Sequence, residues 1–121
     1  MNKIYESGED YLETIFRLQN QMGSVRSIDI AQEKDYSKSS VSRAVNLLKD
    51  NGYITIDASG AIDFTEMGKA KVVKIYERHK LLTENLVKLG VSQKVAEADS
   101  CRIEHVISEE TFLALKKHWG E

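Results

Sequence analysis

Proline is absent from all 121 residues, so nothing in the backbone forces a helix to bend or stop. Glycines mark the breaks instead: Gly23, Gly52 and Gly90 each follow a stretch in which apolar residues recur at helical spacing. This pattern predicts a mainly α-helical protein whose helices are separated by short glycine-containing turns.

The composition is that of a folded protein without a membrane partner. Hydrophobic residues make up 41% and charged residues 30%. The sequence contains no run of about 18 apolar residues, the length that a membrane-spanning helix needs. Residues 1–6 lack the apolar stretch of a secretory signal. The single cysteine rules out an internal disulfide and suits a reducing compartment, so we expect a cytoplasmic protein.

Three helices are predicted in the first half of the chain, at residues 8–21, 28–34 and 38–50. Ser7, Ser27 and Ser37 precede them as candidate N-caps, because a serine hydroxyl accepts a hydrogen bond from the amides of the first turn. The second and third helices are separated by so few residues that they resemble a helix-turn-helix.

Residues 53–57 and 61–65 alternate apolar and polar side chains with the period of strands, and residues 58–60 form the turn between them. Three helices followed by a hairpin make a winged helix-turn-helix. Its third helix has a suitable size and polarity for the major groove of DNA.

The rest of the chain predicts helices at residues 65–89, 93–106 and 109–118, the last two with Ser92 and Ser108 as N-caps. We place a domain boundary near residue 70. Residues 1–70 are then the winged helix-turn-helix DNA-binding domain, and residues 71–121 are a second, helical domain.

The net charge of −2 argues against a partner held by charge alone. Residues 1–70 hold 11 acidic and 8 basic side chains, whereas residues 36–49 hold three basic side chains and no acid. The surrounding carboxylates would repel a phosphate backbone unless part of their charge is neutralised.

The third helix has one polar, cationic face. We expect Arg43 to pair with a base edge, since arginine forms two hydrogen bonds with guanine; a solvated surface charge is the alternative. Lys38 and Arg26 are phosphate candidates, whereas residues 53–65 contain no Lys or Arg for a phosphate contact by the wing. The candidate DNA-contacting residues are Arg26, Ser37, Lys38, Ser39, Ser40, Ser42, Arg43 and Asn46.

Cys101, Glu104 and His105 are the densest group of potential metal ligands. Offsets of three and four put their Cβ atoms about 5–6 Å apart on one helix face, close enough to share a cation. On spacing alone, a metal site and a coincidence stay equally open, because C-x-x-E-H is less specific than paired C-x-x-C motifs.

Asp10, Glu13 and His79 are further candidates, and each has a structural alternative. Asp10 could complete a capping box with Ser7, and Glu13 could be a solvated helix charge. His79 stands between two basic residues and could be a surface histidine.

Together these residues resemble the diphtheria-toxin-repressor family of metal-dependent transcriptional regulators, in particular its short manganese-transport-regulator branch. The resemblance covers almost the whole chain. It rests on Asp10-Tyr11-Leu12-Glu13 with Ile15 and Leu18, residues 37–45, Thr65-x-x-Gly68, Arg78-His79-x-Leu81-Leu82 and Cys101-Arg102-x-Glu104-His105.

The resemblance implies a homodimeric repressor, not an enzyme, that binds double-stranded operator DNA when loaded with Fe²⁺ or Mn²⁺ and controls metal homeostasis. Zn²⁺, Co²⁺ or Ni²⁺ could replace these ions in vitro. Residues 71–121 would bind metal and form the dimer. The implied metal ligands are Asp10, Glu13, His79, Cys101, Glu104 and His105.

Two of these positions depart from the family's patterns. Iron-responsive members have methionine where this chain has Asp10, and manganese-responsive members have glutamate where it has Cys101. The implied site is a hybrid, which leaves the physiological ion and the number of ions open. Thr83 and Glu97 replace two ligands of a second site in iron-type relatives, and the carboxy-terminal SH3-like domain of longer relatives has no counterpart.

We hypothesise that a cation joins the first helix to the helices carrying His79 and the Cys101 cluster. This would set a distance of about 34 Å between the two recognition helices of a dimer. From the residues alone, two alternatives remain: a thiol-based redox-responsive winged-helix regulator that uses Cys101, and a small metallohydrolase.

Overall fold

The computed structural model describes residues 6–120, so the predicted lack of a secretory signal falls mainly on residues outside this range. Contacts between Cα atoms divide the chain into two compact units, residues 1–72 and residues 73–121, with the division inside helix α4 (Glu66–Lys88). The described residues form six helices and one two-stranded sheet, which confirms the mainly α fold class. Each unit is treated separately below.

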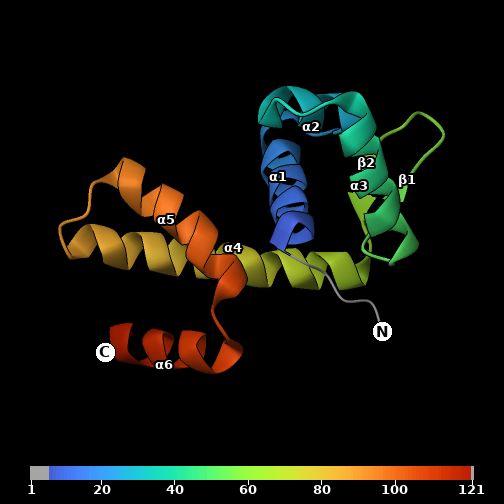
Figure 1. The fold of residues 1–121 in the computed structure, drawn as a ribbon. Helices are drawn as coiled ribbons and strands as arrows, with labels where there is room; N and C mark the ends of the chain where they lie inside the picture. Colours follow the sequence, from blue (N-terminus) through green and yellow to red (C-terminus); the bar gives the residue numbers. More distant parts are fainter. Residues whose placement is uncertain (1–5, 121) are drawn as a thin grey trace. The chain divides into compact units, whose positions relative to one another are not determined.

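The first unit contains α1 (Glu6–Met22), α2 (Ser27–Lys34) and α3 (Lys38–Asp50) (Figure 1). Two predicted N-caps are wrong. Helix α1 already includes Ser7, and the N-cap of α2 is Arg26, whose backbone N–H donates to the Asp29 carboxylate at 2.9 Å. Helix α2 therefore begins at Ser27, one residue earlier than predicted, and the Asp29 carboxylate at its third position binds the backbone N–H of the N-cap residue.

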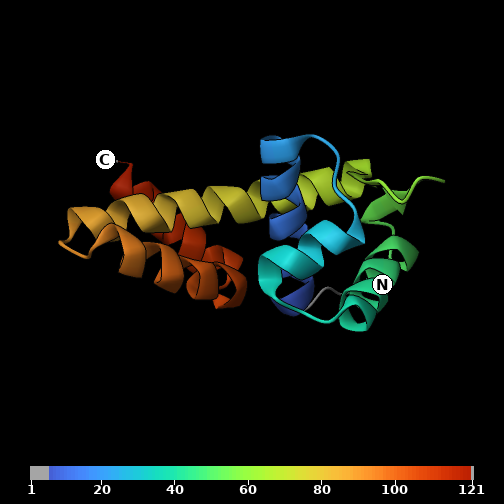
Figure 2. The same cartoon turned by 90° about the horizontal axis from the view of Figure 1, so that it is seen from above.

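The cap of α3 is confirmed, because the Ser37 hydroxyl accepts a hydrogen bond from the Ser40 backbone at 3.2 Å. Asp35 adopts the left-handed conformation (φ +56°), and this allows the chain to turn from α2 into α3 within three residues. Figure 2 shows this short connection from above.

Strands β1 (Ile54–Ile56) and β2 (Ile62–Phe64) pair antiparallel, with Thr55 opposite Asp63. Each is one residue shorter at both ends than predicted. At the end next to the turn, β1 is shorter because Asp57 belongs to the turn. Its carboxylate accepts hydrogen bonds from the Ser59 and Ala61 backbones at 2.8 and 3.0 Å.

The core of the first unit lies where α1, α2, α3 and the hairpin meet. Its fully buried side chains include Leu12, Ile15, Val25, Ile30, Val41, Val45 and Ile54. Helices α1, α2 and α3 and strand β1 each contribute to this set, so burial of this core fixes the orientation of α3.

The Thr65-x-x-Gly68 motif joins the hairpin to α4. The Thr65 hydroxyl accepts a hydrogen bond from the Gly68 backbone at 3.1 Å and donates one to the Gly52 carbonyl at 2.6 Å. A Cβ on Gly68 would lie only 1.8 Å from the Tyr53 carbonyl oxygen. Glycine is therefore required here by close approach of two backbones.

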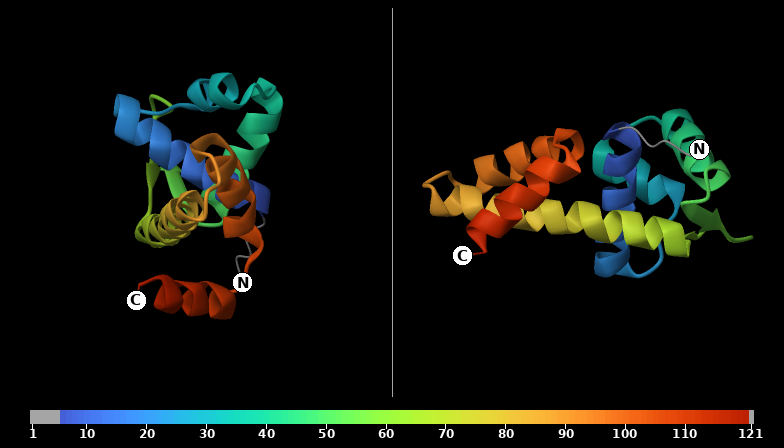
Figure 3. Two further views of the ribbon diagram at one scale, coloured as in Figure 1. Left: turned by 90° about the vertical axis from the view of Figure 1, so that its left-hand side faces the viewer. Right: turned by 90° about the horizontal axis from the view of Figure 1, so that it is seen from below.

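The second unit contains the rest of α4, α5 (Gln93–Val106) and α6 (Glu109–Trp119). The predicted caps are confirmed, since Ser92 accepts from Val95 at 3.3 Å and Ser108 accepts from Thr111 at 3.1 Å. Helix α5 runs back alongside α4, and α6 follows after a short turn (Figures 1 and 3). None of the helices in the described part is long and apolar enough to cross a membrane.

Candidate metal centre and nucleic-acid interface

Glu104 on α5 is the only acidic side chain among the described residues that is classed as buried. Its Oε1 atom lies 3.2 Å from His79 Nδ1 and 3.8 Å from His105 Nε2. Its Oε2 atom is buried and has no hydrogen-bond partner within the described residues. A buried carboxylate oxygen without a partner is costly, and a cation would satisfy it.

His79 on α4 is held by this carboxylate. If Nδ1 donates to the Glu104 carboxylate and the ring is neutral, the lone pair of Nε2 is available to a metal, which is the usual arrangement of carboxylate, histidine and metal. His79 is therefore a paired histidine, not the solvated surface histidine of the structural alternative.

Cys101 and His105 lie one turn apart on α5, as their spacing predicted. Both are half-buried, and the thiol and a ring nitrogen lie within 4.8 Å of each other. Together with His79 and Glu104 they offer sulfur, nitrogen and oxygen donors, a set that suits divalent transition-metal ions better than Mg²⁺ or Ca²⁺. The residues of the second unit thus fit a metal of this class.

Asp10 and Glu13 lie on α1 in the first unit, half-buried, with carboxylate oxygens within 4.8 Å of each other. Because α1 spans Glu6–Met22 and includes Ser7, Asp10 lies beyond the first turn and cannot close a capping box with Ser7. Asp10 Oδ2 instead forms an ion pair of 2.7 Å with Lys34 Nζ on α2. Lys34 is not among the site residues predicted from the sequence.

Arg78 was also missed as an organising residue. Its guanidinium donates to the Ile107 carbonyl at 3.0 Å and to Glu109 at 2.7 Å, and its central carbon lies 5.2 Å from the ring centroid of Phe112. These contacts hold the C-terminal end of α5, which carries Glu104, against α4. No local spacing reveals them, because the hydrogen-bond partners are 29 and 31 residues away in the sequence.

The candidate DNA-contacting residues on α3 are exposed, except for the half-buried Ser40. Asn46 donates from Nδ2 to the Ser42 carbonyl at 2.8 Å, which orients its amide along the helix. Leu47, which is not among the predicted DNA-contacting residues, is 61% exposed on α3, one turn beyond Arg43. An exposed leucine beside an arginine can contact the methyl group of thymine.

A cavity of about 310 Å³ opens between the starts of α2 and α3, lined by Ser27, Ile28, Lys38 and Ser42. Its floor combines one apolar side chain with small hydroxyls, and Lys38 supplies a cation. Lys38 and the serine hydroxyls of this lining could bind phosphate oxygens, and Ile28 could contact apolar parts of DNA.

Arg26 is exposed and donates from Nε to the Ser59 carbonyl in the hairpin turn at 2.9 Å. This contact joins the start of α2 to the wing. In the same turn, hydrogen bonds from the Ser59 hydroxyl and the Ala61 backbone lower the pKa of Asp57. The wing therefore carries a firmly ionised carboxylate at its tip.

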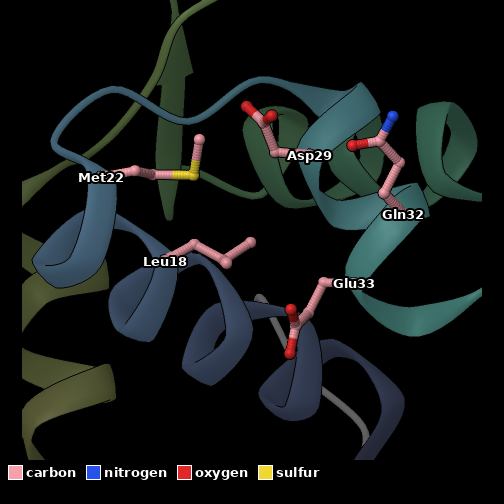
Figure 4. Close-up of a pocket in the computed structure, with 5 residues that line it drawn as sticks. All are labelled: Leu18, Met22, Asp29, Gln32 and Glu33. Carbon is pink, nitrogen blue, oxygen red and sulfur yellow. The ribbon is translucent and has the colours of Figure 1, made fainter.

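A second cavity, of about 250 Å³, lies between α1 and α2 (Figure 4). Leu18 and Met22 line it from α1, with Asp29, Gln32 and Glu33 on α2. Its carboxylates already serve the fold, since Asp29 caps α2 and Glu33 forms an ion pair of 2.8 Å with Arg17.

A winged helix-turn-helix followed by a helical unit with candidate metal ligands is the architecture of a class of metal-dependent DNA-binding proteins. Residues 3–61 match the family description "Iron dependent repressor, N-terminal DNA binding domain". Residues 65–121 match "Iron dependent repressor, metal binding and dimerisation domain". The chain belongs to the iron-dependent repressor family, which confirms the resemblance found in the sequence.

Comparison with individual proteins supports the same family assignment. The iron-dependent repressor IdeR of Mycobacterium bovis is 30% identical over 118 residues, which cover 97% of this chain and 51% of IdeR. An uncharacterized HTH-type transcriptional regulator of Methanocaldococcus jannaschii is 30% identical over 113 residues, 92% of this chain and 90% of that protein. The chain thus spans about half the length of IdeR.

The fold is shared with a manganese-dependent transcriptional repressor whose structure was solved in complex with manganese. The two superpose with a TM-score of 0.84 at 24% identity, over 93% of this chain and 52% of the other. Membership of a family of metal-dependent regulators does not favour the thiol-based alternative that relies on Cys101 alone.

Proposed function

We propose that this protein is a cytoplasmic transcriptional repressor that binds double-stranded operator DNA as a homodimer when loaded with Fe²⁺ or Mn²⁺ and so controls metal homeostasis. Residues 1–70 bind DNA, and residues 71–121 bind metal and form the dimer. The family assignment supports this proposal, because IdeR is an iron-dependent repressor and the structural relative is a manganese-dependent one.

The observation that carries the proposal is the partly unsatisfied, buried carboxylate of Glu104. A protein with no use for a cation here would gain stability from a glutamine or an apolar residue of similar size. Metal binding would explain why a carboxylate is buried at this position, between His79 and His105.

The proposed ligands are Asp10, Glu13, His79, Cys101, Glu104 and His105. A bound divalent cation would supply two positive charges. Asp10 and Glu13 would then no longer add to the negative potential of the DNA-binding half, which carries 11 acids and 8 bases over residues 1–70. A less repelled phosphate backbone and a selected dimer geometry would both favour DNA binding.

On DNA, we propose that α3 enters the major groove, with Arg43 on a base edge and Lys38 and Arg26 on phosphates. The proposed DNA-contacting surface also includes five polar residues, Ser37, Ser39, Ser40, Ser42 and Asn46. A two-fold dimer would present two such helices about 34 Å apart, one turn of DNA.

The helical unit offers apolar surface for the dimer. Its large exposed apolar side chains are Val73, Tyr76, Val87, Leu89, Val95, Val106 and Leu113. Phe112 is 3% exposed and therefore belongs to the buried interior of the unit. Exposed apolar side chains in this number support self-association of the unit.

Metal analysis of anaerobically purified protein, followed by selection of bound sequences from random duplex DNA with Mn²⁺, Fe²⁺ or a chelator, tests the proposal. We expect one sequence to be enriched only with metal. Enrichment controlled by oxidant and not by metal would support the thiol-based alternative. Hydrolytic turnover without DNA binding would support the metallohydrolase.

A further inference from the structure

Lys34 is the last residue of α2, and its ammonium nitrogen lies 2.7 Å from Asp10 Oδ2 on α1. Both side chains are about three-quarters withdrawn from solvent, at 24% and 23% exposure. At this exposure, water and salt screen the pair less than they screen an ordinary surface pair.

The same carboxylate is one of the proposed metal ligands, so the inference below rests on the proposed function. We propose that Lys34 determines metal affinity: its ammonium group competes with a divalent cation for the Asp10 carboxylate and thereby raises the metal concentration at which the protein responds.

The competition follows from charge. An ammonium on one carboxylate oxygen reduces the negative potential at the other, and it repels a divalent cation a few ångströms away. A metal ion that binds Asp10 must therefore either break the ion pair with Lys34 or bind close to the ammonium group. In both cases the free energy of metal binding becomes less favourable. A neutral side chain at position 34 removes that loss.

Position matters as well as charge. Lys34 directly precedes Asp35, Tyr36 and the Ser37 cap of α3, and its ammonium lies 5.9 Å from the centroid of the Tyr36 ring. The ion pair thus joins α1 to the turn that leads into α3. Competition at Asp10 takes place at this junction.

Lys71 provides a matched control. It forms an ion pair of 3.0 Å with Glu9, the residue before Asp10, and its partner is also largely withdrawn from solvent. Glu9 is not a proposed ligand. Removal of either lysine changes the net charge of this region equally, but only removal of Lys34 leaves a proposed ligand without its ammonium.

The test measures Mn²⁺ affinity by competition with a fluorescent chelator, for the wild type, Lys34→Met, Lys34→Gln and Lys71→Met. We expect both Lys34 variants to bind Mn²⁺ about fivefold more tightly than the wild type, and Lys71→Met to stay within about twofold. Circular dichroism verifies that each variant is folded. Without metal, the Lys34 variants should unfold at a lower temperature, because they lack the ion pair.

A double-mutant cycle separates this inference from the proposed function. Asp10→Asn should weaken Mn²⁺ binding, and Lys34→Met should have no further effect in that background. Wild-type affinity for Asp10→Asn overturns both the ligand assignment and the inference. A weakened Asp10→Asn together with unchanged or weaker binding by the Lys34 variants overturns the inference alone, and indicates that Lys34 only positions the carboxylate.

Discussion

The Nδ1 atom of His79 lies 3.2 Å from Oε1 of Glu104, a carboxylate whose side chain has no solvent exposure. Their proximity joins α4 to α5 and orients a histidine ring beside a buried negative charge. The second oxygen of that carboxylate is buried and has no hydrogen-bond partner in the described residues, so Glu104 is the proposed metal ligand that we expect to be most sensitive to substitution.

Glu104→Gln keeps the shape of the side chain and removes its charge. We expect the metal-free variant to be at least as stable as the wild type, because a buried charge is lost. Mn²⁺ at a hundredfold excess over its Kd should stabilise the wild type by about 2.7 kcal/mol and the variant far less. Thermal unfolding with and without Mn²⁺ measures both quantities.

Asp99→Asn is the control, because it removes an exposed acid from the same helix. Its stabilisation by Mn²⁺ should match that of the wild type. Equal stabilisation of Glu104→Gln and the wild type would exclude Glu104 as a ligand.

The stability of Gly68→Ala shows whether close packing or helix propensity dominates at this position. In an exposed helix this change stabilises by about 1 kcal/mol, because alanine is the better helix former. Here the added Cβ would lie 1.8 Å from the Tyr53 carbonyl oxygen, so we expect destabilisation of about 3 kcal/mol. Urea unfolding decides the sign, and a stabilised variant would refute the close approach.

Arg43→Ala and Lys38→Ala separate the reading of bases from the binding of phosphates. Loss of Arg43 should cost about 1–3 kcal/mol on the selected sequence and relax the preference at one base pair. Loss of Lys38 should weaken binding to all sequences alike and reduce the salt slope by about 1. Titrations on the selected duplex and a scrambled duplex measure both effects. An Arg43→Ala protein with unchanged preference would have lost only a solvated charge.

Asp57 gives the hairpin turn a dependence on pH. Hydrogen bonds from Ser59 and Ala61 hold its pKa below the ordinary 3.8, so the folded state favours the ionised form. The stabilisation is complete above that ordinary value and is lost as the pH falls through the lower folded value. The difference in Tm between the wild type and Asp57→Asn should therefore be constant near neutral pH and shrink in acid. A difference that does not change with pH would contradict this account.

Local signals were sufficient for most of the fold. Ser37, Ser92 and Ser108 cap their helices within three residues of the amides they bind, so short-range sequence predicts them. The Ser27 cap failed because Asp29, also local, competes for the same helix end. The spacing of Cys101 and His105 likewise placed both on one face of α5, as found.

Long-range partners could not be predicted. Lys34 and Asp10 lie on different helices, and the hydrogen bonds of Arg78 cross from α4 to the end of α5 and to α6. Only tertiary packing brings such residues together, and no periodicity in the sequence records it. The burial of Glu104 could not be predicted for the same reason, since glutamate is almost never fully buried unless it is paired, and its partner His79 is 25 residues away in the sequence.

The affinity of the wild type for the selected duplex, measured at constant ionic strength with Mn²⁺ and with a chelator, tests the central claim most directly. We predict binding at least about tenfold tighter with Mn²⁺, and no such difference for Glu104→Gln. Equal affinity of the wild type in the two conditions would contradict metal-dependent repression by this protein.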